Sequence, residues 1–341
     1  MPAGTVCVLG AGVIGLTTAL RTRQELPHLS VTLVAEDFGV NTTSQGSGGL
    51  WEPYKLSDTP EALINRWGEA TFHFLADLFN SHEAEASGVQ MAASYILYTK
   101  PPEGPEPAWK HLVPHFRTLS QVELKRLSTR HALFVSGYCF ETAICEMKCF
   151  MPFLLDRVLT SGVAIRRQKV TRLEDLAEYD AVVNCMGLRG ATLFGDDSCY
   201  PIRGQVLRAK ASWIKHHYVV DERFYVIPNN DVVVIGGTQQ VGDWDLRARE
   251  SDTQQILEGC RKFLPSLTSA SIQEPWVGLR PGRKSVRLES ELVKIAGKDR
   301  GLPVVHNYGH GGSGVTLCWG CAIHAVELLK KLDIARSRSR L

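Results

Sequence analysis

The feature that most constrains this chain is a glycine-rich turn close to its start. A mostly apolar run at residues 5–9 leads directly into Gly10, Gly12 and Gly15, spaced G-x-G-x-x-G. This order is typical of a buried strand, a tight turn and the start of a helix in dinucleotide-binding folds. We expect a pyrophosphate to bind at the N-terminus of that helix, where free N–H groups and the helix dipole favour an anion.

A second strand is expected at residues 30–35, and Glu36 follows it. An acidic side chain at this place bonds the ribose hydroxyls of a dinucleotide, so it favours FAD or NAD over a cofactor with a 2′-phosphate. A polar, glycine-rich loop at residues 41–49 offers many N–H and hydroxyl donors, which suit phosphate oxygens.

Composition narrows the class of protein. The 341 residues carry a formal net charge of +2, so neither nucleic acid nor an acidic membrane surface is an expected partner. No apolar stretch approaches the roughly 18 residues of a membrane span, and no basic region precedes the first apolar strand. We therefore expect neither a membrane-spanning segment nor a secretory one. The nine cysteines lack metal-ligand spacing, so we expect no metal site. Their odd number and scattered positions fit reduced thiols in an intracellular compartment. Cys318 and Cys321 are interpreted as part of a helix packing face rather than as a redox pair.

The last three residues, Ser339, Arg340 and Leu341, are a conservative variant of the S-K-L peroxisomal address. The alternative is an ordinary polar tail whose last three residues match the address by chance. Together with chemistry that makes peroxide, the tripeptide predicts a peroxisomal matrix enzyme and the peroxisomal import receptor as a partner.

The pattern along the chain indicates an α/β protein with a discontinuous nucleotide domain. Helices are expected at residues 60–79, with Trp67 and Phe72 buried, at 151–159 and at 321–332; further strands are expected at 180–187, 205–210 and 231–235. We predict a Rossmann-like FAD-binding domain from residues 1–55, 140–195 and 290–341. A second, strand-rich α+β substrate domain would comprise residues 56–139 and 196–289.

Two further segments point to a ligand. Arg280 stands between Leu279 and Pro281, and a buried arginine needs an anion, either a ligand carboxylate or an internal acid in a structural ion pair. Four glycines among residues 309–314 indicate a loop where the backbone approaches a ligand, before a helix resumes near Thr316. A flexible surface loop is the alternative.

Eight motifs occur in the order found in one enzyme family. They lie at residues 10–16, 49–54, 183–187, 201–205, 236–238, 242–244, 278–281 and 306–312. Over essentially its whole length the chain resembles the FAD-dependent D-amino-acid oxidase and D-aspartate oxidase family, and it is somewhat closer to D-aspartate oxidase.

The resemblance implies roles by position. Arg280 would clamp the substrate α-carboxylate, Tyr225 would help to hold it, and the carbonyl of Gly312 would accept from the substrate amine. The implied FAD contacts are Gly10, Ala11, Gly12, Val13, Ile14, Gly15, Glu36, Asp37, Thr42, Thr43, Ser44, Gly48, Gly49, Leu50, Val170, Gly309, Gly311, Gly312, Ser313, Gly314, Val315 and Thr316. Asp37 departs from the arginine often found there in mammalian relatives.

The implied reaction is oxidative deamination of a D-amino acid to a 2-oxo acid, ammonia and H2O2. The α-hydrogen leaves as hydride to flavin N5, with O2 as the final acceptor, and no side chain acts as acid or base. The protein supplies orientation and charge. His310 lies in the glycine-rich loop, where a structural hydrogen-bonding role is favoured over catalysis.

Substrate preference depends on a second cation. D-aspartate and other acidic D-amino acids are favoured, with neutral D-amino acids such as D-alanine as the alternative. Aspartate oxidases carry arginines in a lid and after the Gly-Gly-Thr motif, but here Gln239 fills the second position and the lid at residues 218–221 has none. Arg223, two residues before Tyr225, would share its face in an extended strand and could replace them, or could be a solvated residue. His216 and His217 could also supply charge.

Other classes share parts of this pattern. An NAD-dependent dehydrogenase would have the same first motif, and a non-catalytic FAD-binding relative would keep the fold without the substrate pocket. Glycine and sarcosine oxidases share the broader architecture. A flavin spectrum, its anaerobic bleaching by a D-amino acid and stereospecific turnover separate these possibilities.

Overall fold

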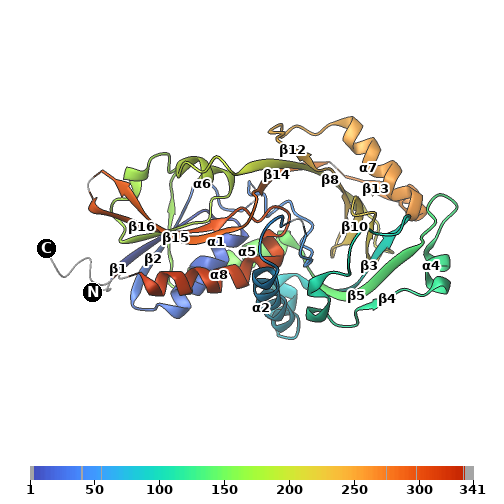
Figure 1. The fold of residues 1–341 in the computed structure, drawn as a ribbon, viewed down its shortest axis with the longest axis horizontal. Helices are drawn as coiled ribbons and strands as arrows, with labels where there is room; N and C mark the ends of the chain where they lie inside the picture. The colour runs from blue at the N-terminus through green and yellow to red at the C-terminus, as the bar shows by residue number, and fades with distance from the viewer. Residues whose placement is uncertain are drawn as a thin grey trace.

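Two β-sheets form opposite ends of the molecule, and the chain passes between them several times (Figure 1). The computed structural model describes residues 4–39, 41–54, 56–273, 275–296, 298–332 and 334. The tripeptide at residues 339–341 lies outside the described residues.

The first sheet has six strands in the order β15-β16-β7-β1-β2-β6. Their bounds are β1 (Gly4–Leu9), β2 (Leu29–Ala35), β6 (Ala164–Arg167), β7 (Ala181–Asn184), β15 (Arg287–Ile295) and β16 (Lys298–Tyr308). All neighbours are parallel except β15 and β16, which are antiparallel. Strand β1 lies between β2 and β7, and the side chains of residues 6–9, which alternate between the two faces of the sheet, are fully buried. Burial on both faces explains the continuous apolar run in the sequence.

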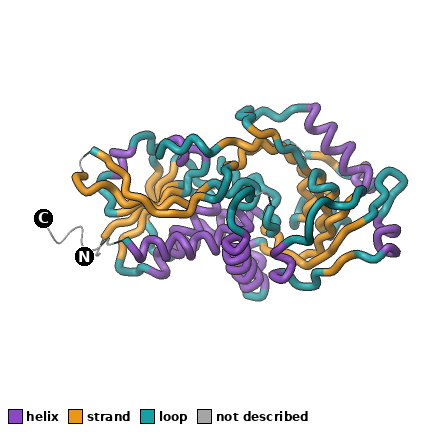
Figure 2. Tube along the Cα trace, in the orientation of Figure 1, coloured by secondary structure: helices purple, strands orange, loops and turns teal. Residues whose placement is uncertain are grey.

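Helices α1 (Val13–Glu25) and α8 (Gly314–Lys331) pack on this sheet. Helix α5 (Met147–Thr160) packs on α1, and α2 (Glu61–Phe79) packs between α8 and strands β3 and β5 of the second sheet. Helix α1 contacts both α5 and α8, and α8 also contacts α2 (Figure 2). At the turn from β1 to α1, Gly10 has a φ of 99°, which only glycine adopts readily. A Cβ at Gly15 would overlap the carbonyl oxygen of Gly10, so helix and strand approach closely, as predicted.

The second sheet has the strand order β12-β8-β11-β10-β9-β3-β5-β4, and β13 and β14 also pair with β8. The bounds are β3 (Val89–Tyr98), β4 (Arg117–Thr118), β5 (Ser136–Cys145), β8 (Tyr200–Lys210), β9 (His217–Val220), β10 (Phe224–Pro228), β11 (Val233–Gly236), β12 (Gln240–Val241), β13 (Ser271–Ile272) and β14 (Trp276–Gly282). Helix α7 (Glu250–Phe263) packs on this sheet. The remaining short helices are α3 (Ala84–Ser87), α4 (Gln121–Leu127), α6 (Leu188–Leu193), η1 (Ala108–Leu112), η2 (Leu173–Leu176) and η3 (Pro265–Ser269).

The strands of the first sheet come from residues 4–35, 164–184 and 287–308, and those of the second from 89–145 and 200–282. Strand β5 runs across the division predicted at residue 140, and β15 begins before the one at 290. Each sheet is therefore assembled from stretches that are separated in sequence.

Most predicted elements are confirmed. Helix α2 has the predicted extent, with Trp67 and Phe72 buried in the core. Two predictions are wrong. The last helix begins at Gly314, close to the restart expected near Thr316 but well before the start expected at residue 321. The extended strand does not include Arg223, because β10 begins at Phe224. Asp221 and Glu222 adopt left-handed turns with φ of 50° and 52°, so the chain reverses just before β10.

The contact between α2 and α8 generates a stability prediction. A Cβ at Gly320 would overlap the backbone of Trp67, and the N–H of Gly320 donates to Thr71 Oγ1 at 3.1 Å. We expect Gly320→Ala to push the helices apart and lower the free energy of unfolding by about 1–3 kcal/mol, measured by thermal unfolding. Gly68→Ala on α2 is the control, since its Cβ would make only ordinary contacts of 3.4 Å or more. Equal melting temperatures for the two variants would contradict this account.

Candidate active site

A cavity of about 1130 Å³ lies between the two sheets and takes lining residues from both. At one end it is bounded by the β1–α1 turn, the end of β2 and the loop at residues 41–49. At the other end it is bounded by residues of β3, β10 and β14 and by the glycine-rich loop before α8. The predicted nucleotide turn and the predicted substrate residues therefore share one cavity.

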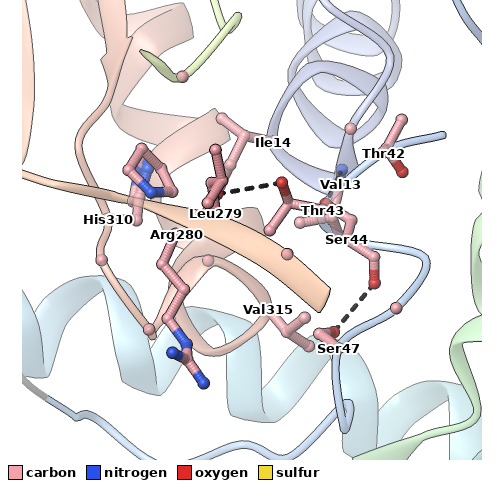
Figure 3. A pocket seen from close by; sticks show the side chains of 18 of the residues that line it. Val13, Ile14, Thr42, Thr43, Ser44, Ser47, Leu279, Arg280, His310 and Val315 are labelled. Atoms are coloured by element: carbon pink, nitrogen blue, oxygen red, sulfur yellow. Dashed lines mark hydrogen bonds between the residues drawn. The ribbon is translucent and has the colours of Figure 1, made fainter. Parts of the chain in front are cut away.

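The N-terminus of α1 is joined to the polar loop. The N–H of Val13 donates to Ser44 Oγ at 3.0 Å, and Thr43 Oγ1 donates to the carbonyl of Leu279 at 3.2 Å (Figure 3). The second bond connects the loop with β14, one residue before Arg280. Hydroxyls and backbone donors are thus concentrated at the positive end of a helix, which is the arrangement that binds phosphate.

Glu36 follows β2 at the edge of the cavity, where it forms ion pairs with Lys169 at 3.3 Å and with Arg189. Hydrogen bonds from Lys169 and then Arg189 lower the pKa of Glu36. The carboxylate is therefore ionised at neutral pH and available to accept hydrogen bonds from ribose hydroxyls. Asp37 and Val170 line the cavity beside it.

Three buried polar atoms on the cavity wall have no hydrogen-bond partner among the described residues: Asn307 Oδ1, His310 Nε2 and His217 Nε2. Buried polar atoms are almost always satisfied, so these three indicate a ligand that supplies the missing partners. Together with the glycine turn, the ionised Glu36 and the hydroxyl-rich loop, they fit a bound dinucleotide such as FAD.

Arg280 on β14 and Tyr225 on β10 lie together at the substrate end. The Nη1 of Arg280 donates to the carbonyl of Thr238 at 3.1 Å, which fixes the guanidinium while other donors stay available. A Cβ at Gly204 on β8 would overlap this guanidinium, so the glycine makes room for it. Burial raises the pKa of Tyr225 against the opposing charge of Arg280, and its hydroxyl stays protonated as a donor. The pair can hold a carboxylate.

The glycine-rich loop closes over this pair. A Cβ on Gly312 would lie 3.1 Å from Tyr54 Cδ1 and 3.9 Å from Arg280 Cδ. The hydroxyl of Tyr54 donates to the carbonyl of Glu222 at 3.2 Å and accepts from Gln239. The loop, the segment at residues 50–54 and β14 therefore meet around one small volume.

Most predicted site residues line the cavity. These are Gly10, Ala11, Gly12, Val13, Ile14, Glu36, Asp37, Thr42, Thr43, Ser44, Gly48, Gly49, Leu50, Val170, Tyr225, Arg280, Gly311, Gly312, Gly314 and Val315. Gly15, Gly309, Ser313 and Thr316 are outside this lining. Ser313 and Thr316 instead bond the backbone of residues 52–54.

Arg223 is not brought to the main cavity. It is exposed, its guanidinium lies 5.0 Å from the centroid of the Phe224 ring, and it lines a second cavity of about 410 Å³ together with Gln239. The left-handed turn before β10 directs this residue away from Tyr225. The structure therefore does not place Arg223 as a second cation beside Arg280.

The two buried histidines of the cavity are neutral. His217 Nδ1 lies 2.7 Å from Ser94 Oγ, and desolvation lowers the pKa of both His217 and His310 to about 3. Neither imidazole supplies positive charge at neutral pH. His217 therefore does not provide the second cation that the side chain of an acidic substrate would need.

Sequence reasoning missed Glu52. Its side chain lines the cavity between Trp51 and Pro53, and burial, with a smaller contribution from Glu222, raises the pKa of Glu52 to about 8. A glutamate is usually exposed, so the sequence alone did not single it out. Its position beside Trp51 and Pro53, two residues before Tyr54, was the available signal.

The predictions about metal sites, cysteines and membrane spans are compared here with the described residues. No group of three or more metal-ligating side chains occurs among them, and the nine cysteines are free. Cys318 and Cys321 are buried on α8 and burial raises the pKa of both thiols, in line with a packing role. Within the same residues, no helix is long and apolar enough to cross a membrane.

The fold is shared with solved structures of oxidases. A crystal structure of glycine oxidase from Bacillus cereus ATCC 14579 superimposes with a TM-score of 0.74 and 18% identity, covering 96% of this chain and 95% of that chain. Iminodiacetate oxidase from Chelativorans sp. BNC1 gives a TM-score of 0.74 at 17% identity, with 97% and 98% of the two chains covered.

Sequence relatives are much closer. D-aspartate oxidase of Homo sapiens is 36% identical, covering 97% of this chain and 96% of the relative. D-amino acid oxidase of Dugesia ryukyuensis is 34% identical, with 96% and 98% covered, and D-amino-acid oxidase of Rubrobacter xylanophilus is 36% identical, with 94% of each covered. The family described as DAO, FAD dependent oxidoreductase, matches residues 5–328. With this match and these relatives, the chain belongs to the DAO family of FAD-dependent oxidoreductases.

Proposed function

We propose that this enzyme oxidises D-amino acids with O2, producing a 2-oxo acid, ammonia and H2O2. The observation that carries the proposal is the pairing of Arg280 and Tyr225 in the same cavity as the dinucleotide turn. The sequence relatives named D-aspartate oxidase and D-amino acid oxidase support the substrate class. The imino acid formed by oxidation hydrolyses in water to the 2-oxo acid and ammonia.

The residues of the chain orient the substrate. Arg280 binds the α-carboxylate through its planar guanidinium, Tyr225 donates a further hydrogen bond, and the carbonyl of Gly312 accepts from the amine. Gly10–Ile14, Glu36 and the loop at residues 41–49 would hold FAD. Bound FAD supplies the acceptor for the two electrons of the Cα–H bond. The neutral imidazoles of the cavity are not needed as acids or bases for this reaction.

The charges that line the cavity favour neutral over acidic D-amino acids. This is the reverse of the preference expected from the sequence. Among the described residues that line it, the cationic side chains are Lys169, Arg189 and Arg280. Lys169 and Arg189 pair with Glu36 at the nucleotide end, and Arg280 is committed to the α-carboxylate. A side-chain carboxylate would then be buried without a cation, at a large desolvation cost.

Arg280→Ala should lower kcat/KM for every D-amino acid by about 100-fold or more, because it removes the charge that all substrates share. Tyr225→Phe removes one hydrogen bond and should cost about tenfold. The measurement is peroxide formation by FAD-saturated protein, with the flavin absorbance confirming that each variant holds its cofactor. A loss confined to one substrate would contradict the role of Arg280.

Peroxide production should be faster with D-alanine than with D-aspartate and undetectable with L-aspartate at matched concentrations. Arg223→Ala should change kcat/KM for D-alanine and D-aspartate by the same small factor, about twofold or less, since exposed charges contribute little. Faster turnover of D-aspartate, combined with a selective rise of its KM in Arg223→Ala, would restore Arg223 as the second cation.

We also propose the peroxisomal matrix as the site of action, supported by the peroxide product and by the tripeptide at residues 339–341. Fluorescently tagged full-length protein should give a punctate signal that coincides with a peroxisomal marker, and removal of the three residues should make it diffuse. An unchanged punctate signal after removal would show that this tripeptide is not the address.

A further inference from the structure

We propose that Glu52 makes this oxidase selective for D-amino acids whose side chain ends in a cation, such as D-lysine or D-ornithine. The inference rests on the proposed oxidation of D-amino acids and specifies its substrate class. Three observations carry it: the rigid placement of Glu52, the absence of a partner for its carboxylate among the described residues, and the charge balance of the substrate end.

The backbone of Glu52 is held on both sides. Its N–H donates to Thr316 Oγ1 at 3.1 Å, and the same hydroxyl donates to its carbonyl at 3.0 Å. The preceding Trp51 is fully buried, and its indole Nε1 donates to the carbonyl of Gly68 at 3.0 Å. The carboxylate therefore projects from a fixed base on the cavity wall, as recognition of a ligand group requires.

The carboxylate lacks an ion pair or side-chain hydrogen bond to any residue that the structure describes. Burial and the neighbouring Glu222 favour its protonated form, while Tyr98 and Tyr138, which line the same part of the cavity, carry no positive charge. An ammonium or guanidinium on the substrate would take the place of the proton, which passes to solvent, and would satisfy the ionised group.

The charge balance of the substrate end favours the same substrates. Once the α-carboxylate neutralises Arg280, the ionisable groups left on the described part of the wall at this end are two carboxyl groups, those of Glu52 and Glu222. They attract a cationic side chain and repel that of D-aspartate. The aromatic walls formed by Tyr98, Trp109 and Tyr138 suit a methylene stem and can contact a cation through their faces.

A different role for the same carboxylate makes a distinct prediction. If Glu52 took a proton from the substrate α-ammonium, it would act on every D-amino acid alike. Recognition of the side chain acts only on substrates that carry a distal cation. The two roles are separated by comparing substrates that share the α-carbon and differ at the end of the side chain.

The experiment compares D-lysine with D-norleucine, whose side chain is a straight alkyl chain without the ammonium. Steady-state kcat/KM is measured at pH 8 for the FAD-saturated wild type and for Glu52→Gln. We expect the wild type to prefer D-lysine by at least about tenfold. Glu52→Gln should lower the D-lysine to D-norleucine ratio of kcat/KM about tenfold and leave kcat/KM for D-norleucine within about threefold of the wild-type value.

Glu222→Gln is the matched control, because it removes the same charge from an exposed residue at the mouth of the cavity. The D-lysine to D-norleucine ratio of kcat/KM should change much less in Glu222→Gln than in Glu52→Gln, since solvent screens the exposed group. The visible spectrum of the flavin in each variant verifies folding and cofactor content.

Equal losses on D-lysine and D-norleucine in Glu52→Gln, or an unchanged ratio, would overturn the inference. Failure of the proposed function is distinguishable from either result. In that case no D-amino acid of any class would bleach the flavin of the wild-type holoenzyme without oxygen, whereas failure of this inference alone would leave bleaching by D-norleucine and D-alanine intact.

Discussion

Two hydroxyl groups at the start of α8 connect the two ends of the cavity. Ser313 Oγ bonds both the N–H and the carbonyl of Tyr54, and Thr316 Oγ1 does the same for Glu52. The segment at residues 50–54, which forms part of the substrate wall, is therefore anchored to the glycine-rich loop and to a helix that packs on α1. The position of the substrate wall relative to the dinucleotide turn depends on these four bonds.

The guanidinium of Arg280 depends on a second constraint, the pairing of β14 with β8. The register places Gly278 opposite Gly204, and the space left by Gly204 receives the Arg280 side chain. Thr43 ties the carbonyl of Leu279 to the polar loop, so the strand that carries the arginine is also fixed to the nucleotide end. Arg280 and the wall at residues 50–54, which we propose bind the substrate, are thus both positioned by contacts with the part of the chain that would hold the cofactor.

The parts of the site that could be predicted from sequence are those in which backbone geometry demands a residue type. Gly10 and Gly15 have no substitutes at a left-handed turn and a close helix–strand contact, so they signal the nucleotide fold directly. The positions of Arg223 and Glu52 could not be predicted from the sequence. The turn that removes Arg223 from the cavity is made by Asp221 and Glu222, which carry no glycine signal, and the burial of Glu52 arises only when β3, β5 and α8 come together.

The segment at residues 218–221, expected as a lid, belongs mostly to a paired strand. Strand β9 is hydrogen-bonded to β3 on one side and to β10 on the other, inside the larger sheet. Swinging it outward would break ladder bonds on both edges at once. While the sheet stays paired, the parts of this segment that can move are its side chains and the turn that carries Glu222. A hinge that opened β9 would have to unpair it from two strands, unlike the free loops that usually close over an active site.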